Sequence, residues 1–241
     1  MRVLVISVPR SCSTITTTTV AQKFGLLNIS ETFANSGHYA AINIMNGDRL
    51  FTERNPSANL LPLSLETEDN YCGKILCGVF IQNRISYSTF NWSCIDKIVF
   101  TTRADVVDQV ASWLMLSVAH NRSKRLSDIE RAKFTSSYSQ MRASVTFEMM
   151  PYIIENFTIF QTVRDYLYKH YPNKCATVSY EMYQSPDAAQ QLSAATNWNI
   201  TPEDLPIKNE WDGRTNKNYS VDVSNYDILR SVVQKAGLMN V

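Results

Sequence analysis

The sequence has little glycine, only 7 in 241 residues, and the first of them is Gly25. Glycine-rich phosphate loops of the G-x-G-x-x-G or G-x-x-x-x-G-K-[ST] kind need glycines where a first buried strand turns into a helix. The strand and helix that we predict below both precede Gly25. A glycine-rich dinucleotide turn and a Walker-type loop are therefore excluded at that turn.

An excess of charge of one sign is also absent, since 23 Lys and Arg face 22 Asp and Glu and give a net charge of +1. A broad basic face for nucleic acid is therefore not expected, and any anion site must be small and local. No stretch approaches the roughly 20 apolar residues of a membrane span. The N-terminal run Val3–Val8 is too short for a signal peptide and is followed by Pro9-Arg10.

These absences predict a cytoplasmic protein, in the host cytoplasm if the source is viral, which binds neither nucleic acid nor a membrane. The five cysteines include no C-x-x-C pair, and there are three histidines. We therefore expect neither a metal site nor a disulfide framework. A hydrophobic fraction of 44% is ample for a packed core, and we expect one domain over residues 1–241 of open oligomeric state.

Short continuous apolar runs rich in β-branched residues predict strands buried on both faces at 1–7, 96–102 and 175–180. Helical patterns lie between and after them, at 14–24, 104–119, 127–171 with an interruption at Pro151, 185–196 and 224–236. Strands that alternate with helices predict an α/β fold with a mainly parallel central sheet flanked by helices.

The first strand-to-helix turn, Pro9–Thr14, combines an arginine with consecutive hydroxyl side chains. The first amides of a helix have no intrahelical acceptor, so phosphate or sulfate oxygens bind there readily. Arg10 would add a donor fork and a fixed charge. The same pattern is also typical of an ordinary helix start, in which Ser13 or Thr14 caps the helix and Arg10 is solvated.

The second predicted strand ends in a similar way, with Arg103 followed by a helix that carries Ser112. Ligands of open α/β sheets sit outside the carboxyl ends of the strands, so Arg10 and Arg103 would face one crevice if their strands are neighbours. Alternatively, Arg103 forms a local ion pair with Asp105, and Ser112 packs against another helix.

The chain resembles the sulfotransferases that use 3′-phosphoadenosine 5′-phosphosulfate (PAPS), and within them the bacterial carbohydrate type that includes trehalose sulfotransferase. Pro9–Thr14 is similar to the family's P-R-S-G-S-T loop, with Cys12 in place of the glycine. Residues 102–112 follow its T-R-x-D-x-x-x-Q-x-x-S element. Residues 178–186 look like its Y-E-D-L segment, which ends a strand and is followed by a proline.

The resemblance implies a P-loop-like three-layer fold and transfer of a sulfuryl group from PAPS to a small-molecule or carbohydrate acceptor. It implies that Arg10 contacts the transferring group and that Arg103 and Ser112 hold the 3′-phosphate. It also implies that Tyr180 lies against the adenine. Alternatively, Tyr180 is a half-buried tyrosine at the end of a strand, with no role in binding. The residues assigned to the 5′-phosphosulfate are Arg10, Ser11, Cys12, Ser13 and Thr14.

A hydroxyl acceptor needs a general base, and two residues are candidates. Glu31 stands where carbohydrate-type relatives carry a glutamate suggested as base, although a surface carboxylate is an equal alternative. His38, just after a glycine, is the rival. Two other functions stay open: a P-loop-type nucleotide kinase or NTPase, weakened by the missing G-K-[ST], and a non-catalytic nucleotide-binding relative.

Overall fold

The structure, a computed structural model, describes residues 1–28, 70–82, 86–89, 92–123, 142–206 and 219–240. These residues group into two compact units. The first contains residues 1–104 and 156–206, and the second contains residues 105–155 and 207–241. The prediction of a single domain stays a prediction.

The first unit is built on a five-stranded sheet in the order β2-β3-β1-β4-β5, in which every pairing is parallel. Its strands are β1 (Arg2–Ser7), β2 (Leu27–Asn28), β3 (Tyr71–Leu76), β4 (Lys97–Thr102) and β5 (Cys175–Ser179). The three predicted strands are confirmed as β1, β4 and β5. The sequence patterns did not predict β2 or β3.

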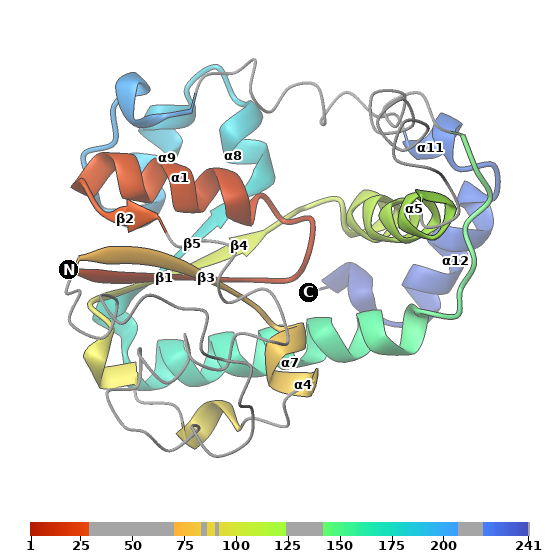
Figure 1. Ribbon diagram of the computed structural model, residues 1–241, viewed down its shortest axis with the longest axis horizontal. Helices are drawn as coiled ribbons and strands as arrows, with labels where there is room; N and C mark the ends of the chain where they lie inside the picture. Colours follow the sequence, from red (N-terminus) through yellow and green to blue (C-terminus); the bar gives the residue numbers. More distant parts are fainter. Residues whose placement is uncertain (29–69, 83–85, 90–91, 124–141, 207–218, 241) are drawn as a thin grey trace. The chain divides into compact units, whose positions relative to one another are not determined.

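Helices cover both faces of this sheet, as Figure 1 shows. One face carries α1 (Ser13–Phe24), α8 (Tyr180–Gln184) and α9 (Ala188–Thr196). The other carries residues 156–170 of α7 (Met150–His170), where Phe160 and Tyr168 pack on Phe100 of β4 with ring centroids 5.8 and 5.7 Å away. The central strand β1 is buried from Val3 to Ser7. The predicted three-layer α/β fold with a parallel sheet is therefore confirmed.

The remaining short elements of this unit are α4 (Gly78–Gln82) and four 3-10 turns, η4 (Tyr87–Thr89), η5 (Trp92–Cys94), η7 (Pro172–Lys174) and η8 (Pro202–Asp204). Helix α1 ends at Gly25, which adopts a left-handed conformation with φ +61°. This conformation is the usual helix stop that the sequence predicted.

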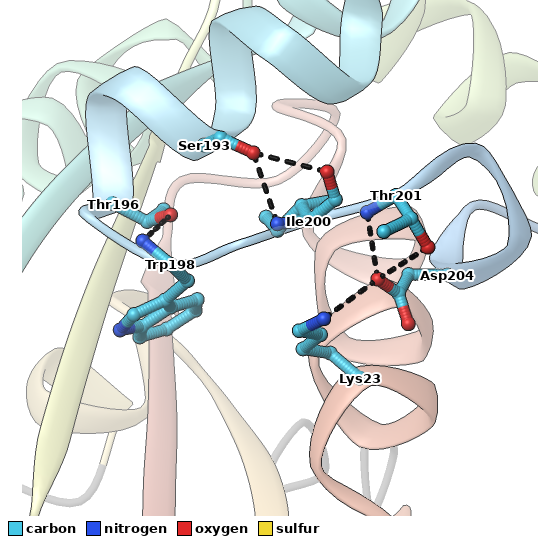
Figure 2. A network of polar contacts seen from close by, with 7 residues as sticks. All are labelled: Lys23, Ser193, Thr196, Trp198, Ile200, Thr201 and Asp204. Atoms are coloured by element: carbon cyan, nitrogen blue, oxygen red, sulfur yellow. Dashed lines mark hydrogen bonds and ion pairs between the residues drawn. The ribbon is translucent and has the colours of Figure 1, made fainter.

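A polar network joins the end of α1 to the segment after α9 (Figure 2). Asp204 accepts hydrogen bonds from the Thr201 amide at 2.8 Å and its hydroxyl at 3.1 Å, and pairs with Lys23 of α1 at 3.2 Å. The Ser193 hydroxyl bonds both backbone groups of Ile200. These contacts join the C-terminal end of α1 to the segment that follows α9.

The second unit is helical and contains α5 (Val106–Ser123), α11 (Tyr219–Asp222), α12 (Tyr226–Lys235) and the 3-10 turn η10 (Leu238–Asn240). The Tyr226 hydroxyl donates to Asp108 of α5 at 2.7 Å. Asn225 exchanges two 2.9 Å hydrogen bonds with the backbone of Val145. Helices were predicted at both α5 and α12, and both are confirmed.

The helix predicted over 127–171 is wrong in its middle part, because residues 142–149 form no helix and Ala143 instead makes a bridge with Val223. Pro151 lies in the first turn of α7 rather than interrupting a longer helix. Proline is tolerated there because the first amides of a helix have no acceptor to lose. Residues 127–141 lie outside the described part.

Candidate functional site at the carboxyl edge of the sheet

The two predicted anion-binding turns leave neighbouring strands. In the sheet, β1 lies between β3 and β4, and Ser7 at the end of β1 is paired with Thr101 of β4. After β1 come the edge strand β2 and then β3, which lies between β2 and β1, whereas the later strands β4 and β5 lie on the other side of β1. The strand β1 is therefore a topological switch point. The premise that placed Arg10 and Arg103 at one edge is therefore confirmed.

The turn after β1 has an unusual backbone, since Arg10 and Cys12 both adopt left-handed conformations, with φ of 70° and 65°. A residue with a Cβ pays about 1–2 kcal/mol for this conformation, which glycine adopts freely. The position of Cys12 thus explains why a glycine would suit this turn. Alternating backbone conformations of this kind turn successive N–H groups toward one point, which makes a concavity for an anion.

Cys12 is also the N-cap residue of α1, and no side chain caps this helix. The alternative in which Ser13 or Thr14 serves as the N-cap is therefore wrong. The Thr16 amide begins the hydrogen bonding of the helix by donating to the Cys12 carbonyl at 3.0 Å. Because no side chain caps the start of α1, the positive end of its dipole and its first N–H groups can interact with a bound anion.

Ser11 has a different role from the one the sequence suggested for its hydroxyl. Its side chain is fully buried, donates to the Val8 carbonyl at 2.7 Å, and lies 2.7 Å from the Thr101 hydroxyl of β4. Because a hydroxyl has one proton, Thr101 is then the donor to Ser11. The Ser11 side chain therefore connects the turn to β4. The group of Ser11 that remains for an anion is its backbone N–H.

Lys74 is a member of this site that the sequence analysis missed. It lies on β3, is only 4% exposed, and its ammonium donates to the Thr14 hydroxyl at 3.2 Å. Thr14 itself is exposed in the first turn of α1, whereas Ser13 is buried. A buried ammonium beside an exposed hydroxyl at a helix start adds positive charge where an anion would bind.

The end of β4 is tied to the start of α8. The Arg103 guanidinium lies 4.6 Å from the ring centroid of Tyr180, and Glu181 accepts the Ala104 amide at 3.0 Å. Tyr180 is the first residue of α8 rather than the last of a strand. Arg103 and Tyr180, which the resemblance joined at one nucleotide site, are thus brought into contact.

The Cys12 thiol is influenced by residues of both turns. Burial raises the pKa of this thiol to about 12, and the negative charge of Glu181 raises it while the Thr16 hydroxyl and the positive charge of Arg103 lower it. Both charges therefore lie close enough to act on the turn after β1. At neutral pH the thiol is neutral and adds no charge to the site.

Three predicted site residues are not brought into this arrangement by the described structure. Ser112 is buried on α5, in the second unit, and its assignment to the 3′-phosphate stays a prediction. Glu31 and His38 lie outside the described residues. Asp105 caps α5 by accepting the Asp108 amide at 2.9 Å.

Comparison with known proteins identifies no matching family model and no significantly similar curated protein. Over the described ranges, no group of three or more His, Cys, Asp or Glu side chains is placed to hold a metal ion. No helix in that part of the chain has the length and apolar character needed to cross a bilayer.

Proposed function

We propose that the protein is a PAPS-dependent sulfotransferase. The observation that carries the proposal is the turn after β1, where two left-handed residues lead into an uncapped helix beside Lys74. A second arginine follows the adjacent strand. Two separate cationic positions at one sheet edge match a nucleotide that carries phosphate groups at both ends of its ribose.

The residues of the chain fit this nucleotide in distinct roles. The N–H groups of residues 11–14 would hold the 5′-phosphosulfate, with Arg10 and Lys74 supplying positive charge. Arg103 would hold the 3′-phosphate, and Ser112 is proposed to assist it. Tyr180 would offer the adenine the ring face that Arg103 does not cover.

Bound PAPS supplies an activated sulfuryl group, whose bond to the phosphate oxygen breaks as a bond to an acceptor hydroxyl or amine forms. Arg10, Lys74 and the amides of the turn stabilise the charge that develops on the phosphate oxygen. A base must take the acceptor proton, and Glu31 and His38 are the proposed candidates. We take a carbohydrate as the first acceptor class to test, because the resemblance is to the carbohydrate type.

Thermal unfolding with 3′-phosphoadenosine 5′-phosphate (PAP) tests this proposal. PAP without Mg²⁺ should raise the melting temperature, and Arg103→Ala should abolish the increase. Stabilisation by Mg·ATP but not by PAP would instead support a nucleotide kinase, and no response to either ligand would exclude both.

Catalysis needs its own experiment. Incubation with PAPS and a panel of sugars, followed by mass spectrometry, should reveal an added sulfuryl group on one acceptor. Glu31→Gln should then lose turnover while it keeps PAP binding. If PAP binds and no acceptor in a broad panel is modified, the non-catalytic nucleotide-binding alternative is favoured.

A further inference from the structure

The short helix α8 contacts both halves of the candidate site. At its start, Tyr180 lies under Arg103 and Glu181 bonds Ala104, both at the end of β4. One turn later, Tyr183 is buried, which raises the pKa of its hydroxyl, and this hydroxyl lies close enough to α1 for the Thr16 side chain to lower that pKa. A five-residue helix is too short to be stable by itself, so these side-chain contacts fix its position.

Within α8, Glu181 contacts the backbone next to Arg103. Its Oε1 atom accepts the amide of Ala104, the residue that follows Arg103. Its Oε2 atom is buried and has no hydrogen-bond partner among the described residues. A buried carboxylate oxygen without a partner costs free energy, so the position of Glu181 is not explained by its contribution to folding.

The charge of Glu181 gives no explanation either. A carboxylate near a phosphate site repels the ligand, and the effect of Glu181 on the pKa of Cys12 indicates that this charge acts on the turn after β1. What the residue offers to an anion site is the hydrogen bond to Ala104. This bond fixes the backbone at the point where Arg103 leaves β4.

We propose that Glu181 is a positioning residue for Arg103, which it orients by accepting the Ala104 amide. The inference rests on the proposed function, because it assigns Arg103 to the 3′-phosphate of the nucleotide. An arginine fork binds a phosphate with two parallel hydrogen bonds, so a small rotation of its backbone costs affinity. Glu181 therefore sets the preference for nucleotides that carry a 3′-phosphate.

Calorimetric titration with PAP and with AMP, which lacks the 3′-phosphate, tests this role. The ratio of their dissociation constants measures the 3′-phosphate preference, which a general loss of stability would not change selectively. Glu181→Gln keeps an acceptor and should keep this ratio within about threefold. Glu181→Met has the same length without an acceptor and should reduce the ratio about tenfold or more, by weakening PAP and not AMP.

Two further variants complete the experiment. In an Arg103→Ala background, Glu181→Met should cause no additional loss of the ratio, because the residue acts through Arg103. Glu155→Met changes an exposed glutamate of α7 in the same way and should leave the ratio unchanged. If Glu181→Met does not fold, as judged by its melting curve, Glu181→Ala takes its place.

The outcomes separate this inference from the proposed function. If the unmodified protein does not bind PAP, the proposed function fails and the inference with it. If it prefers PAP to AMP and the Met variant keeps that preference, only the role of Glu181 is overturned. An equal loss in the Gln and Met variants would also overturn it, because the carboxylate charge rather than the accepted hydrogen bond would then matter.

Discussion

The hydroxyl groups of Ser11 and Thr101 lie 2.7 Å apart, although the two residues are 90 positions apart in the sequence. Both side chains are buried, and Ser11 also donates to Val8. This pair joins the turn after β1 to the neighbouring strand β4. The conformation of the candidate anion site therefore depends on a contact within the sheet as well as on the turn itself.

Thr101→Val should destabilise the protein by about 1–2 kcal/mol, because it removes a buried hydrogen bond while it keeps the shape of the side chain. Urea denaturation measures the change. Thr177→Val on β5 is the matched control, since its hydroxyl contacts Tyr168 in a more exposed place. Equal losses in the two variants would contradict a special role for the Ser11–Thr101 pair.

The left-handed conformation of Cys12 leads to a second prediction, which compares two substitutions at that position. Cys12→Gly and Cys12→Ala both remove the thiol, but only alanine keeps a Cβ at φ 65°. We expect the glycine variant to be more stable by about 1 kcal/mol. Gly25→Ala, at φ +61° with no neighbouring atom within 4 Å, should show a loss of similar size in chemical denaturation.

The result for Cys12 also bears on nucleotide binding. If the turn adopts the same conformation with glycine, the affinity for PAP should change less than about threefold, since the binding groups are backbone amides. A large gain in affinity for Cys12→Gly would show that the cysteine distorts or crowds the site, and would contradict the turn described above.

Local patterns predicted the strands that flank the candidate turns, because β1, β4 and β5 are continuous apolar runs. They did not predict β3, whose run is interrupted by Gly73 and Lys74. A lysine within a buried strand breaks the apolar pattern of a parallel sheet. Lys74, a residue of the candidate site, is thus one reason why the sequence pattern did not predict β3.

The role of Ser11 could not be predicted for a different reason. A serine in a turn before a helix is equally suited to bind an anion or to bind the protein itself. Its actual partner, Thr101, is distant in sequence, and only the pairing of β1 with β4 brings the two together. The positive φ of Cys12 was likewise hidden, because cysteine gives no signal for that conformation.

The ion pair of Lys23 with Asp204 predicts a pH dependence of stability. Burial opposes ionisation of Asp204, but hydrogen bonds from Thr201 and Lys23 and the charge of Lys23 together hold its pKa below the ordinary value. A lowered carboxyl pKa stabilises the fold above the unfolded-state pKa, near 3.9, and this contribution is lost as pH falls through the folded-state pKa.

We therefore expect the stability difference between the unmodified protein and Asp204→Asn to be constant above about pH 5 and to disappear as the pH falls below about 3.9. Urea denaturation across this range measures it. The coupling with Lys23→Met should be no more than about 1 kcal/mol, since both side chains keep some solvent contact, 20% for Lys23 and 16% for Asp204. A difference that grows as the pH falls would contradict this sign.

Lys74 provides the last prediction, because its buried ammonium contacts Thr14 at the start of α1. Lys74→Met keeps the length and apolar stem of the side chain and removes its charge. If this charge faces the bound phosphates, the dissociation constant of PAP should rise about tenfold or more while the fold persists. Lys97→Met is the matched control, because Lys97 begins β4 and bonds Asn173 at the opposite edge of the sheet.

Salt dependence distinguishes a direct contact of Lys74 from an indirect effect. Loss of one cation at the phosphates should make PAP binding less sensitive to ionic strength, whereas a displaced α1 would weaken binding without changing that sensitivity. An unchanged affinity in Lys74→Met would mean that the ammonium has a structural role, such as its bond to Thr14, and makes no contact with the phosphates. The turn after β1 would then bind its anion with Arg10 and the helix amides alone.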